Sequence, residues 1–480
     1  MYNAHAKSVQ PEPSIRIGII GGGIGGSSCS YFLHELFGAK ASIDVYEPSD
    51  IGGRIATVDI GGHTYESGAS IIHPGNMYMK KFTKEFGLKH KDKIPGQKMG
   101  FYDGEKFVFL ESDWVIATYA KMLWHYGWDL IKFRREIGVF VEKFSRIYDS
   151  QKKGVAYSSV EGIMNTIGGN EVVDYTKVPF LKALKDRGYK DVIIDEMMAI
   201  ATRVNYGQSV NMSAFAGFVS VAGIQGGLFS VHGGNNQVCS QLLQKSRANI
   251  IKSTIKGVKL DTESATPGYY LTIAANENSN STFHTSERYD IIVIATPLHE
   301  GKSNISFEGF PKKITNFPGR FHRTVATFVD GELNTASFGF KNMSGCPNQI
   351  LTTKDNQFKI NSIAHNLPID CKVGNKESQK PVWKVFSKEP LSEKQLYALF
   401  ASRKEMKVVD WLAYPHYDPQ NSLPKFELHD QLYYINGIEW AASAIEMLIV
   451  GSRNTALLAY NKYNGLNDMI DVDFNQKTEL

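Results

Sequence analysis

The chain has 480 residues, of which 42% are hydrophobic and 21% are charged, a composition typical of folded globular proteins that excludes a disordered chain. This length exceeds the roughly 250 to 300 residues at which single hydrophobic cores stop growing, so we expect two packed domains. The net charge of +4 comes from Lys and Arg residues spread along the whole chain, which disfavours nucleic acid as a partner.

The N-terminal residues 1–14 contain no apolar segment, and we expect them to form a disordered tail without a visible secretory signal. No apolar run elsewhere approaches the roughly 18 residues of a membrane span. The four cysteines are widely separated and lack a CxxC or a clustered His, so the sequence predicts neither a metal site nor a disulfide scaffold. These cysteines are Cys29, Cys239, Cys346 and Cys371.

The first predicted element is a short apolar strand over residues 15–20, which runs into a glycine cluster and then a helical pattern. Gly21, Gly23 and Gly26 have the G-x-G-x-x-G spacing of a dinucleotide-binding turn. The first glycine permits the tight turn, the second lets the backbone approach a pyrophosphate, and the third allows close packing of the helix. The pyrophosphate then lies at the helix N-terminus, where free N–H groups attract anions.

A second predicted strand ends in Glu47, which lies 21 positions after Gly26. This spacing is close to the roughly 20 positions expected for the acid that binds the ribose hydroxyls of a dinucleotide. Strand, glycine turn, helix and acid therefore occur in the order of a dinucleotide-binding fold.

A second glycine turn, Gly52-Gly53-Arg54, follows Glu47, and an NAD enzyme has no need of it. The E-x4-GGR arrangement resembles the extended motif of the flavoprotein class that includes amine oxidases and protoporphyrinogen oxidases. That resemblance implies FAD as the cofactor, with Gly53 and Arg54 along its pyrophosphate. It also implies that the following segment, with Ala69 and Ser70, passes the isoalloxazine.

Residues 113–135 form one helical pattern that is rich in aromatic side chains. Such a stripe packs in a protein core more often than it lines a ligand channel. A helix with aromatic residues and a basic end also suits a membrane surface, which is a third interpretation. The aromatic residues are Trp114, Tyr119, Trp124, Tyr126 and Trp128.

Later segments fit the same dinucleotide fold. A strand pattern contains Ile255, which we expect on the adenine, and residues 289–297 form a buried strand that ends beside the cofactor. Near the C-terminus a strand and a turn at Gly437 precede an apolar helix from about Ala441. In this flavoprotein class such a helix N-terminus faces the flavin. Glu446 is then either a helix-packing acid or a contact to the ribityl chain.

We therefore predict an α/β protein with a Rossmann-type FAD-binding domain and a discontinuous mixed α+β substrate domain. The FAD-binding domain is predicted to comprise residues 15–95, 225–300 and 426–470. The substrate domain is predicted to comprise residues 96–224 and 301–425.

Two motifs are far more specific than the glycine turns: "TRVNYGQ" at residues 202–208 and "NGIEWAASA" at residues 436–444. The segment "WLAYPHY" at residues 411–417 accompanies them. With them, nearly the whole chain after residue 14 resembles prenylcysteine oxidase, a family of flavoprotein thioether oxidases. The resemblance implies an enzyme that converts an S-farnesyl- or S-geranylgeranyl-cysteine, with O2 and water, to cysteine, the prenyl aldehyde and hydrogen peroxide.

The resemblance also implies a lysosomal or secretory location, glycosylation, and association with membranes or lipoprotein particles. Four N-x-[ST] sequons fit this expectation, although about four occur by chance in a chain of this composition. They lie at Asn211, Asn280, Asn304 and Asn342.

Three residues are candidates for the chemistry. His73 is expected near the flavin, either as a proton acceptor that assists water addition or as a structural histidine before Pro74. Tyr206 either orients substrate or water, or is a packed aromatic. Glu66 is a weaker candidate, because carboxylates beside glycine turns often bind backbone N–H groups.

The substrate pocket is expected to be long and apolar, because each buried CH2 of an isoprenoid contributes roughly 0.8 kcal/mol. Arg203 is a candidate for binding the cysteine carboxylate, with pairing to a nearby acid as the alternative. Trp440 is expected to shape the pocket. Two other functions share every FAD motif: another oxidase of the amine oxidase and porphyrinogen oxidase superfamily, and a flavin-binding homologue without activity.

Overall fold

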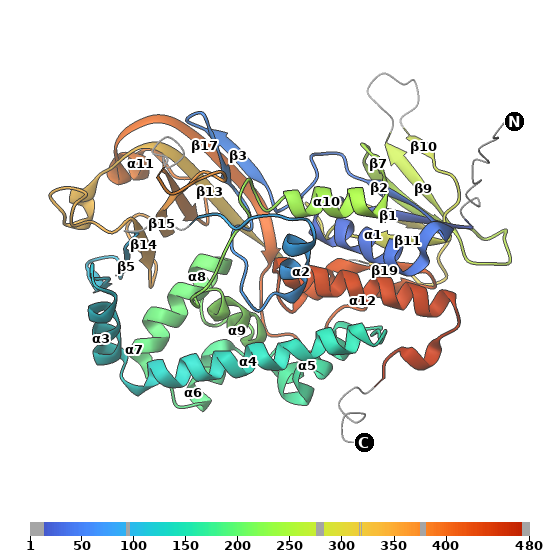
Figure 1. Ribbon diagram of the computed structural model, residues 1–480, viewed down its shortest axis with the longest axis horizontal. Helices are drawn as coiled ribbons and strands as arrows, with labels where there is room; N and C mark the ends of the chain where they lie inside the picture. Colours follow the sequence, from blue (N-terminus) through green and yellow to red (C-terminus); the bar gives the residue numbers. More distant parts are fainter. Residues whose placement is uncertain are drawn as a thin grey trace, which may run out of the picture.

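The computed structural model describes residues 14–92, 97–274, 283–315, 317, 319–374 and 381–472. The expected disordered tail, apart from Ser14, and the sequon at Asn280 lie outside the described residues. The described chain forms an elongated molecule with one large sheet near each end (Figure 1). The long helix α4 (Trp128–Lys152) runs along its lower edge in that view.

A six-stranded sheet has the order β18-β19-β11-β1-β2-β7, with β1 parallel to both β2 and β11. Its strands come from widely separated parts of the sequence, which agrees with a discontinuous domain. They are β1 (Ile15–Ile20), β2 (Ala41–Tyr46), β7 (Asn249–Ile251), β11 (Ile291–Ile294), β18 (Glu427–His429) and β19 (Leu432–Tyr434).

The two faces of this sheet are covered differently. Ile17 and Ile19 share a core with the helices α1 (Ile24–Phe37), α10 (Gln237–Ser246) and α12 (Ile445–Tyr463). Ile20, on the opposite face, packs against a second sheet of order β10-β9-β8-β12. That sheet comprises β8 (Ile255–Leu260), β9 (Tyr269–Ala274), β10 (Phe283–Thr285) and β12 (Ser306–Glu308). Its strand β12 falls within the segment predicted for the substrate domain, yet it pairs with β8.

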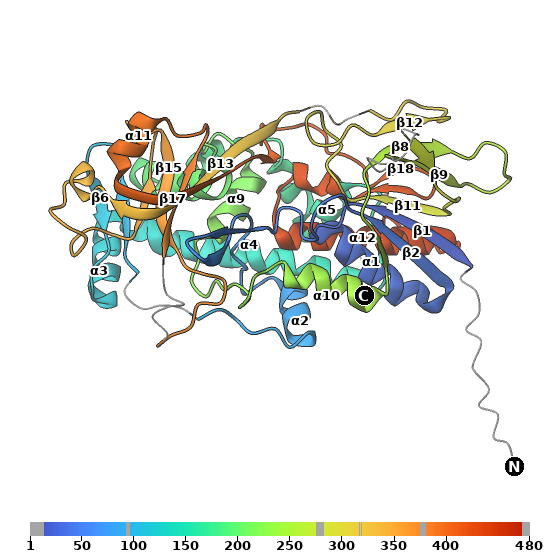
Figure 2. The same cartoon turned by 90° about the horizontal axis from the view of Figure 1, so that it is seen from above.

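A seven-stranded sheet has the order β17-β13-β16-β15-β14-β5-β6 at the other end of the molecule (Figure 2). Its long antiparallel pair, β13 with β17, packs against a hairpin of β3 and β4 through Ile60 and Tyr65. The strands of the sheet and the hairpin are β3 (Thr57–Ile60), β4 (His63–Glu66), β5 (Met99–Tyr102), β6 (Phe107–Leu110), β13 (Phe321–Leu333), β14 (Gln349–Thr352), β15 (Ile360–Asn366), β16 (Val382–Ser387) and β17 (Phe400–Pro415).

The remaining helices mostly cover one face of the seven-stranded sheet or bridge to the six-stranded sheet (Figures 1 and 2). They are α2 (Met77–Glu85), α3 (Val115–Tyr126), α5 (Val160–Asp174), α6 (Phe180–Asp186), α7 (Asp191–Ile193), α8 (Ala199–Tyr206), α9 (Ala214–Ala222) and α11 (Glu393–Leu399). In the described part of the chain, no helix combines the length and apolar character of a membrane span.

Two helix predictions need correction. The single helical pattern over residues 113–135 is divided into α3 and α4 at Gly127, whose φ of 61° is unfavourable for other residues. The C-terminal apolar helix begins at Ile445 and not near Ala441, because Ile435–Trp440 form a 3-10 helix first.

The interpretation of the aromatic stripe as a core element is wrong for its three tryptophans. Trp114, Trp124 and Trp128 are 76%, 84% and 81% exposed, and only Tyr126 of the stripe is buried. The four cysteines, in contrast, are all buried and free of disulfides. A helical period alone does not distinguish a face that packs on the core from one that faces outward.

Candidate active site

The glycine turn of the six-stranded sheet forms one end of a cavity. β1 runs into Gly21, which has a φ of 113°, and α1 begins at Ile24. A Cβ on Gly26 would lie 1.8 Å from the Gly21 carbonyl oxygen, so this close packing requires glycine. A Cβ on Gly23, however, would meet nothing closer than the Gly52 carbonyl oxygen at 3.7 Å. The space beside Gly23 therefore belongs to the cavity, where a ligand can approach the backbone.

This cavity, which we call the cofactor cavity, has a volume of about 530 Å³ and lies at the carboxyl ends of β1, β2 and β11. Doubly wound folds bind their ligands at this edge. The first residues of α1 and α12 line the cavity, and neither helix has a side-chain cap on its N-terminal N–H groups. These N–H groups attract negative charge. The predicted cofactor residues on its wall are Gly21, Gly23, Glu47, Gly53, Arg54 and Ala69.

Glu47 follows β2 and lies between the glycine turn and the cofactor cavity. One carboxylate oxygen, Oε2, accepts a hydrogen bond from the Gly22 N–H at 2.9 Å, and Oε1 accepts one from the Ser49 N–H at 2.9 Å. These bonds fix the carboxylate at the wall of the cavity, where its remaining lone pairs suit ribose hydroxyls.

Two cations, Arg54 and Lys302, lie on the wall of the cofactor cavity. Arg54 donates to the Ala413 carbonyl oxygen at 2.6 Å and forms an ion pair with the fully buried Glu439. Burial and, secondly, the Arg54 charge lower the pKa of Lys302 to about 8. A pyrophosphate here would meet both cations and the helix N-termini, so the residues present fit FAD.

A larger cavity of about 790 Å³, the substrate cavity, lies between the seven-stranded sheet and the helices α3, α4 and α8. Its volume is in the range of small-molecule sites. Among its described lining residues none is acidic, whereas Arg134 and Lys384 are basic. Apolar side chains dominate the lining, among them Phe101, Leu130, Phe133, Met197, Ile200 and Leu351.

A third cavity of about 300 Å³, which we call the connecting cavity, shares wall residues with both the cofactor cavity and the substrate cavity. Val204, Asn205 and Phe386 line all three cavities. Ala69 lines the cofactor and connecting cavities, and Ser70 lines the connecting and substrate cavities. Both residues thus lie at the passage where the sequence motif implied contact with the isoalloxazine, and their role in binding stays a prediction.

His73 lines the connecting cavity, and both of its ring nitrogens have partners. The Gly75 N–H donates to Nδ1 at 2.9 Å, so the neutral ring carries its hydrogen on Nε2, which donates to the Gln225 Oε1 at 2.8 Å. No lone pair is left to accept a proton from water. This arrangement favours the structural alternative for His73.

Tyr206 also lies at the junction of the cavities, but its hydroxyl donates to the Ser443 carbonyl oxygen at 2.9 Å. Its ring packs edge-on against Tyr414 and Tyr417, and burial raises the pKa of its hydroxyl. Tyr206 is therefore a rigid, neutral wall residue, which suits orienting a ligand and does not suit proton abstraction.

Glu66 is buried at the end of β4 and lines none of the three cavities. Its Oε1 accepts a hydrogen bond from the Asn235 N–H at 2.7 Å, as the alternative of a backbone-binding carboxylate predicts. Burial raises the pKa of this carboxyl. Because Glu66 lines none of the cavities, its carboxylate is not placed to touch a substrate there.

The two predicted substrate residues lie outside the cavities. Arg203 forms an ion pair with Asp355 at 2.9 Å, which matches the alternative of pairing with a nearby acid. Trp440 is buried against Phe317 and Phe321 beside the six-stranded sheet. Neither residue is placed to touch a ligand in the substrate cavity.

Two predicted cofactor residues are likewise packing residues in the structure. Ile255 lies in the core between the six-stranded and four-stranded sheets, beside Ile20 and Tyr46, and does not line the cofactor cavity. Gly437 lies within the 3-10 helix, where an added Cβ would be 3.2 Å from the Cβ of Pro424. The neighbouring Asn436, and not Gly437, reaches the cofactor cavity.

Glu446 at the start of α12 binds the N-terminus of α2 and does not line the cofactor cavity. Its carboxylate accepts hydrogen bonds from the Tyr78 N–H at 2.7 Å, the Met79 N–H at 3.1 Å and the Tyr148 hydroxyl at 2.8 Å. Of the two interpretations, these contacts favour the helix-packing acid. Burial raises the pKa of this carboxyl to about 7, although the three hydrogen bonds oppose the shift.

The raised pKa of Glu446 predicts a pH-dependent stability. The folded protein favours the protonated carboxyl of Glu446. The contribution of this group to the stability of the folded protein is therefore fully present below the ordinary pKa of about 4.5, and it is lost as the pH rises through about 7. Between about pH 5.5 and pH 7 we expect the free energy of unfolding of the unsubstituted protein to decrease. This decrease is expected to exceed that of Glu446→Gln by on the order of 2 kcal/mol. Urea unfolding at each pH measures the difference, with the exposed Glu393→Gln as control. Parallel curves for the protein and Glu446→Gln would contradict the shift.

The sequence reasoning missed the contribution of β16. Lys384 and Phe386 from this strand line the substrate cavity, and Lys384 is buried with its Nζ 3.0 Å from the Glu66 carbonyl oxygen. Burial lowers the pKa of Lys384 to about 8. The one available signal was a lysine in an otherwise apolar strand pattern, "VWKVF".

Comparison with known proteins gives two family matches. The family described as prenylcysteine lyase matches residues 109–472, and an NAD(P)-binding Rossmann-like domain matches residues 19–86. Prenylcysteine oxidase 1 of Homo sapiens is 40% identical over 468 residues, which cover 96% of this chain and 92% of the relative. Prenylcysteine oxidase 1-like of Homo sapiens is 38% identical over 476 residues, which cover 98% and 95%.

Solved structures agree on the fold. Cyclohexylamine oxidase from Brevibacterium oxydans has a TM-score of 0.58 at 13% identity and covers 94% of this chain and 100% of its own. A fatty acid isomerase from P. acnes has a TM-score of 0.57 at 12% identity, with coverages of 92% and 97%. The predicted Rossmann-type fold of the amine oxidase class is thus confirmed. With a family match over most of its length and full-length relatives at about 40% identity, the chain belongs to the prenylcysteine lyase family.

Proposed function

We propose that this chain is an FAD-dependent oxidase that cleaves the thioether of an S-prenyl-cysteine and uses O2 as the final electron acceptor. The observation that carries the proposal is an apolar substrate cavity that shares the wall residues Val204, Asn205 and Phe386 with a dinucleotide cavity, in a member of the prenylcysteine lyase family. The substrate, one O2 and one water become cysteine, the prenyl aldehyde and hydrogen peroxide, which balances atoms and electrons.

FAD, when bound, supplies a two-electron acceptor for the carbon between the sulfur and the double bond, where both neighbours stabilise positive charge. The residues of this chain position the substrate. The apolar wall of the substrate cavity binds the isoprenoid tail, and Val204, Asn205 and Phe386 hold the reacting end at the passage to the cofactor cavity.

The charges of the substrate cavity help to distinguish the rival functions. An amine oxidase of the same fold binds a cationic or basic substrate, but this cavity carries Arg134 and Lys384 and no acidic side chain among the residues described. Those two cations suit the free carboxylate of a cysteine conjugate. The charge pattern therefore favours the thioether substrate over an amine.

Peroxide release tests the proposal directly. Purified flavin-loaded protein is expected to produce hydrogen peroxide from S-farnesylcysteine and none from benzylamine, and its flavin colour is expected to bleach when the thioether is added without oxygen. Peroxide from benzylamine would indicate an amine oxidase. A protein that keeps its flavin but oxidises neither substrate would support the inactive homologue.

We also propose a lysosomal or secretory location with association to membranes or lipoprotein particles, as sequence resemblance implied. The asparagines of three sequons, Asn211, Asn304 and Asn342, are exposed, as glycan attachment requires. Expression in animal cells behind a secretory signal, followed by enzymatic glycan removal, tests attachment at these sites. Unchanged electrophoretic mobility after that treatment would contradict it.

The hydrogen bonds of His73 predict the effect of its removal. In His73→Ala we expect unchanged flavin content and slower turnover, with the loss in kcat/KM well under the roughly 100-fold minimum typical of a lost general base. The reason is that both ring nitrogens already bind Gly75 and Gln225. Peroxide release as a function of pH measures the effect. A loss above that minimum, with a changed pH profile, would assign His73 as the proton acceptor.

A further inference from the structure

Helix α3 presents an apolar face to the outside of the molecule. Its residues recur at the i, i+3, i+4, i+7 and i+8 spacing, which normally marks the face that packs on a core. Here every one of them is exposed, Ile116 by 83% and Trp124 by 84%. We call this surface the α3 face; it comprises Ile116, Tyr119, Ala120, Leu123 and Trp124.

Two further exposed tryptophans flank α3 in the sequence. Trp114 precedes α3 and Trp128 begins α4, and both are more than three quarters exposed. Tryptophan combines an apolar ring with a polar N–H, so it favours the boundary between water and lipid. Within the described chain, no other cluster of exposed large apolar side chains includes a tryptophan.

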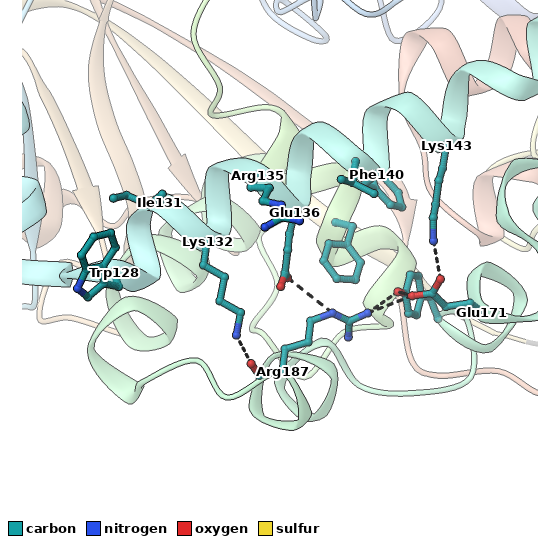
Figure 3. Close-up of a pocket in the computed structure, with 12 residues that line it drawn as sticks. Trp128, Ile131, Lys132, Arg135, Glu136, Phe140, Lys143, Glu171 and Arg187 are labelled. Carbon is teal, nitrogen blue, oxygen red and sulfur yellow. Dashed lines mark hydrogen bonds and ion pairs between the residues drawn. The ribbon is translucent and has the colours of Figure 1, made fainter.

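Residues 113–135, which include α3 and the start of α4, contain four cations and two acids. α3 contains Lys121 and no acidic residue, and the exposed Arg134 and Arg135 follow on α4. The two acids have partners, since Asp113 pairs with Lys98 and Asp129 accepts a hydrogen bond from the Lys190 N–H. On the adjoining side of α4, Glu136 and Glu171 pair with Arg187, as Figure 3 shows, whereas Arg135 has no partner drawn there. This surface therefore complements an anionic one.

The α3 face continues into the substrate cavity. Tyr119 belongs to both, and Met122 of α3 lines the cavity beside it. Across the gap, Arg134 of α4 also lines the cavity, with its guanidinium carbon 4.8 Å from the centre of the Tyr119 ring. The half-exposed Tyr119 thus joins the α3 face to the wall of the substrate cavity.

We infer that the α3 face, with Trp114 and Trp128, docks on an anionic phospholipid surface and admits the prenyl chain from the lipid to the substrate cavity. The route for the prenyl chain rests on the proposed function, whereas the docking does not. A lipid surface explains three features together: tryptophans flanking an apolar helix face, an excess of cations in residues 113–135, and the contact of that face with the substrate cavity at Tyr119. A protein partner would account for the apolar residues without requiring the open cavity.

Vesicle binding tests the docking. Flavin-loaded protein is expected to sediment with phosphatidylcholine vesicles that contain phosphatidylserine, and at least about tenfold more weakly with phosphatidylcholine alone. The double variant Ile116→Glu/Trp124→Glu is expected to bind the anionic vesicles about 100-fold more weakly, because each lost apolar contact is worth about tenfold. Tyr397→Glu, at a 69% exposed aromatic on α11, is the matched control and should bind normally.

Two activity measurements separate the docking from the proposed function. With S-farnesylcysteine held in anionic vesicles, the double variant is expected to lose turnover in proportion to binding, but with dissolved substrate it should match the unsubstituted protein. Failure of the unsubstituted protein to oxidise dissolved substrate would overturn the proposed function and leave the vesicle result standing. Normal vesicle binding by the double variant would overturn the docking. A dimer of the unsubstituted protein in solution that is absent from the double variant would also overturn the docking, because a second copy would then occupy the α3 face.

Discussion

Gly23→Trp is expected to fold and to be purified without flavin. The backbone of Gly23 has an ordinary φ of −72°, and an added Cβ would meet no atom closer than 3.7 Å, so the indole enters the cofactor cavity and not the protein core. There it fills the space in which a pyrophosphate approaches the helix N-terminus. Visible flavin absorbance of the purified variant, compared with its circular dichroism, measures binding and folding separately.

The matched control is Gly138→Trp, at an exposed position of α4 where no atom lies within 4 Å of an added Cβ. This variant should retain flavin. The thermal midpoint of Gly23→Trp should equal that of the unsubstituted protein stripped of flavin, because a ligand stabilises only the state that binds it. A yellow Gly23→Trp protein would refute the assignment of the cofactor cavity.

Ala364→Trp is expected to abolish most turnover of S-farnesylcysteine without loss of flavin. Ala364 lies on β15 in the wall of the substrate cavity and does not line the cofactor cavity. An indole there occupies the space of three or four isoprenoid carbons, so kcat/KM should fall about 100-fold at roughly 0.8 kcal/mol for each carbon. Peroxide release over a range of substrate concentrations measures the loss.

Ala336→Trp, at an exposed alanine that lines none of the three cavities, serves as the control and should turn over normally. A substrate with a shorter prenyl chain should be less affected by Ala364→Trp than S-farnesylcysteine, because its tail leaves more of the cavity empty. Equal losses for both chain lengths, or none for either, would show that the tail binds elsewhere.

The dinucleotide half of the site was predictable because its signals are local. The strand, the turn at Gly21 and the helix packed at Gly26 all lie within a short segment of the sequence. At each of these two positions a side chain would clash with the backbone, and the G-x-G-x-x-G spacing indicates this requirement for glycine. Arg54 also lies on the cavity wall, and its contact with a pyrophosphate stays a prediction. Its partner Glu439 comes from the distant 3-10 helix, and no local pattern specifies that pairing.

The substrate half could not be predicted in the same way, because long-range strand pairing assembles it. β16 carries Lys384 and Phe386 into the cavity only after it pairs with β13 and β15. Arg203, chosen for its motif, instead finds Asp355 across the fold. The motif does lie on a helix that lines the cavities, because Val204 and Asn205, which follow Arg203, are on their walls. Adjacent residues of a helix point in different directions, so Arg203 itself does not line a cavity.

The burial of the cysteines has a consequence for the peroxide that the proposed reaction releases. Burial raises the pKa of Cys239 to about 12 and that of Cys346 to about 11, and it raises the pKa of Cys29 as well. Peroxide attacks the thiolate and not the neutral thiol. The protein therefore resists damage by its own product during repeated catalytic cycles, and its inactivation is expected to proceed by routes other than sulfur oxidation at these three positions.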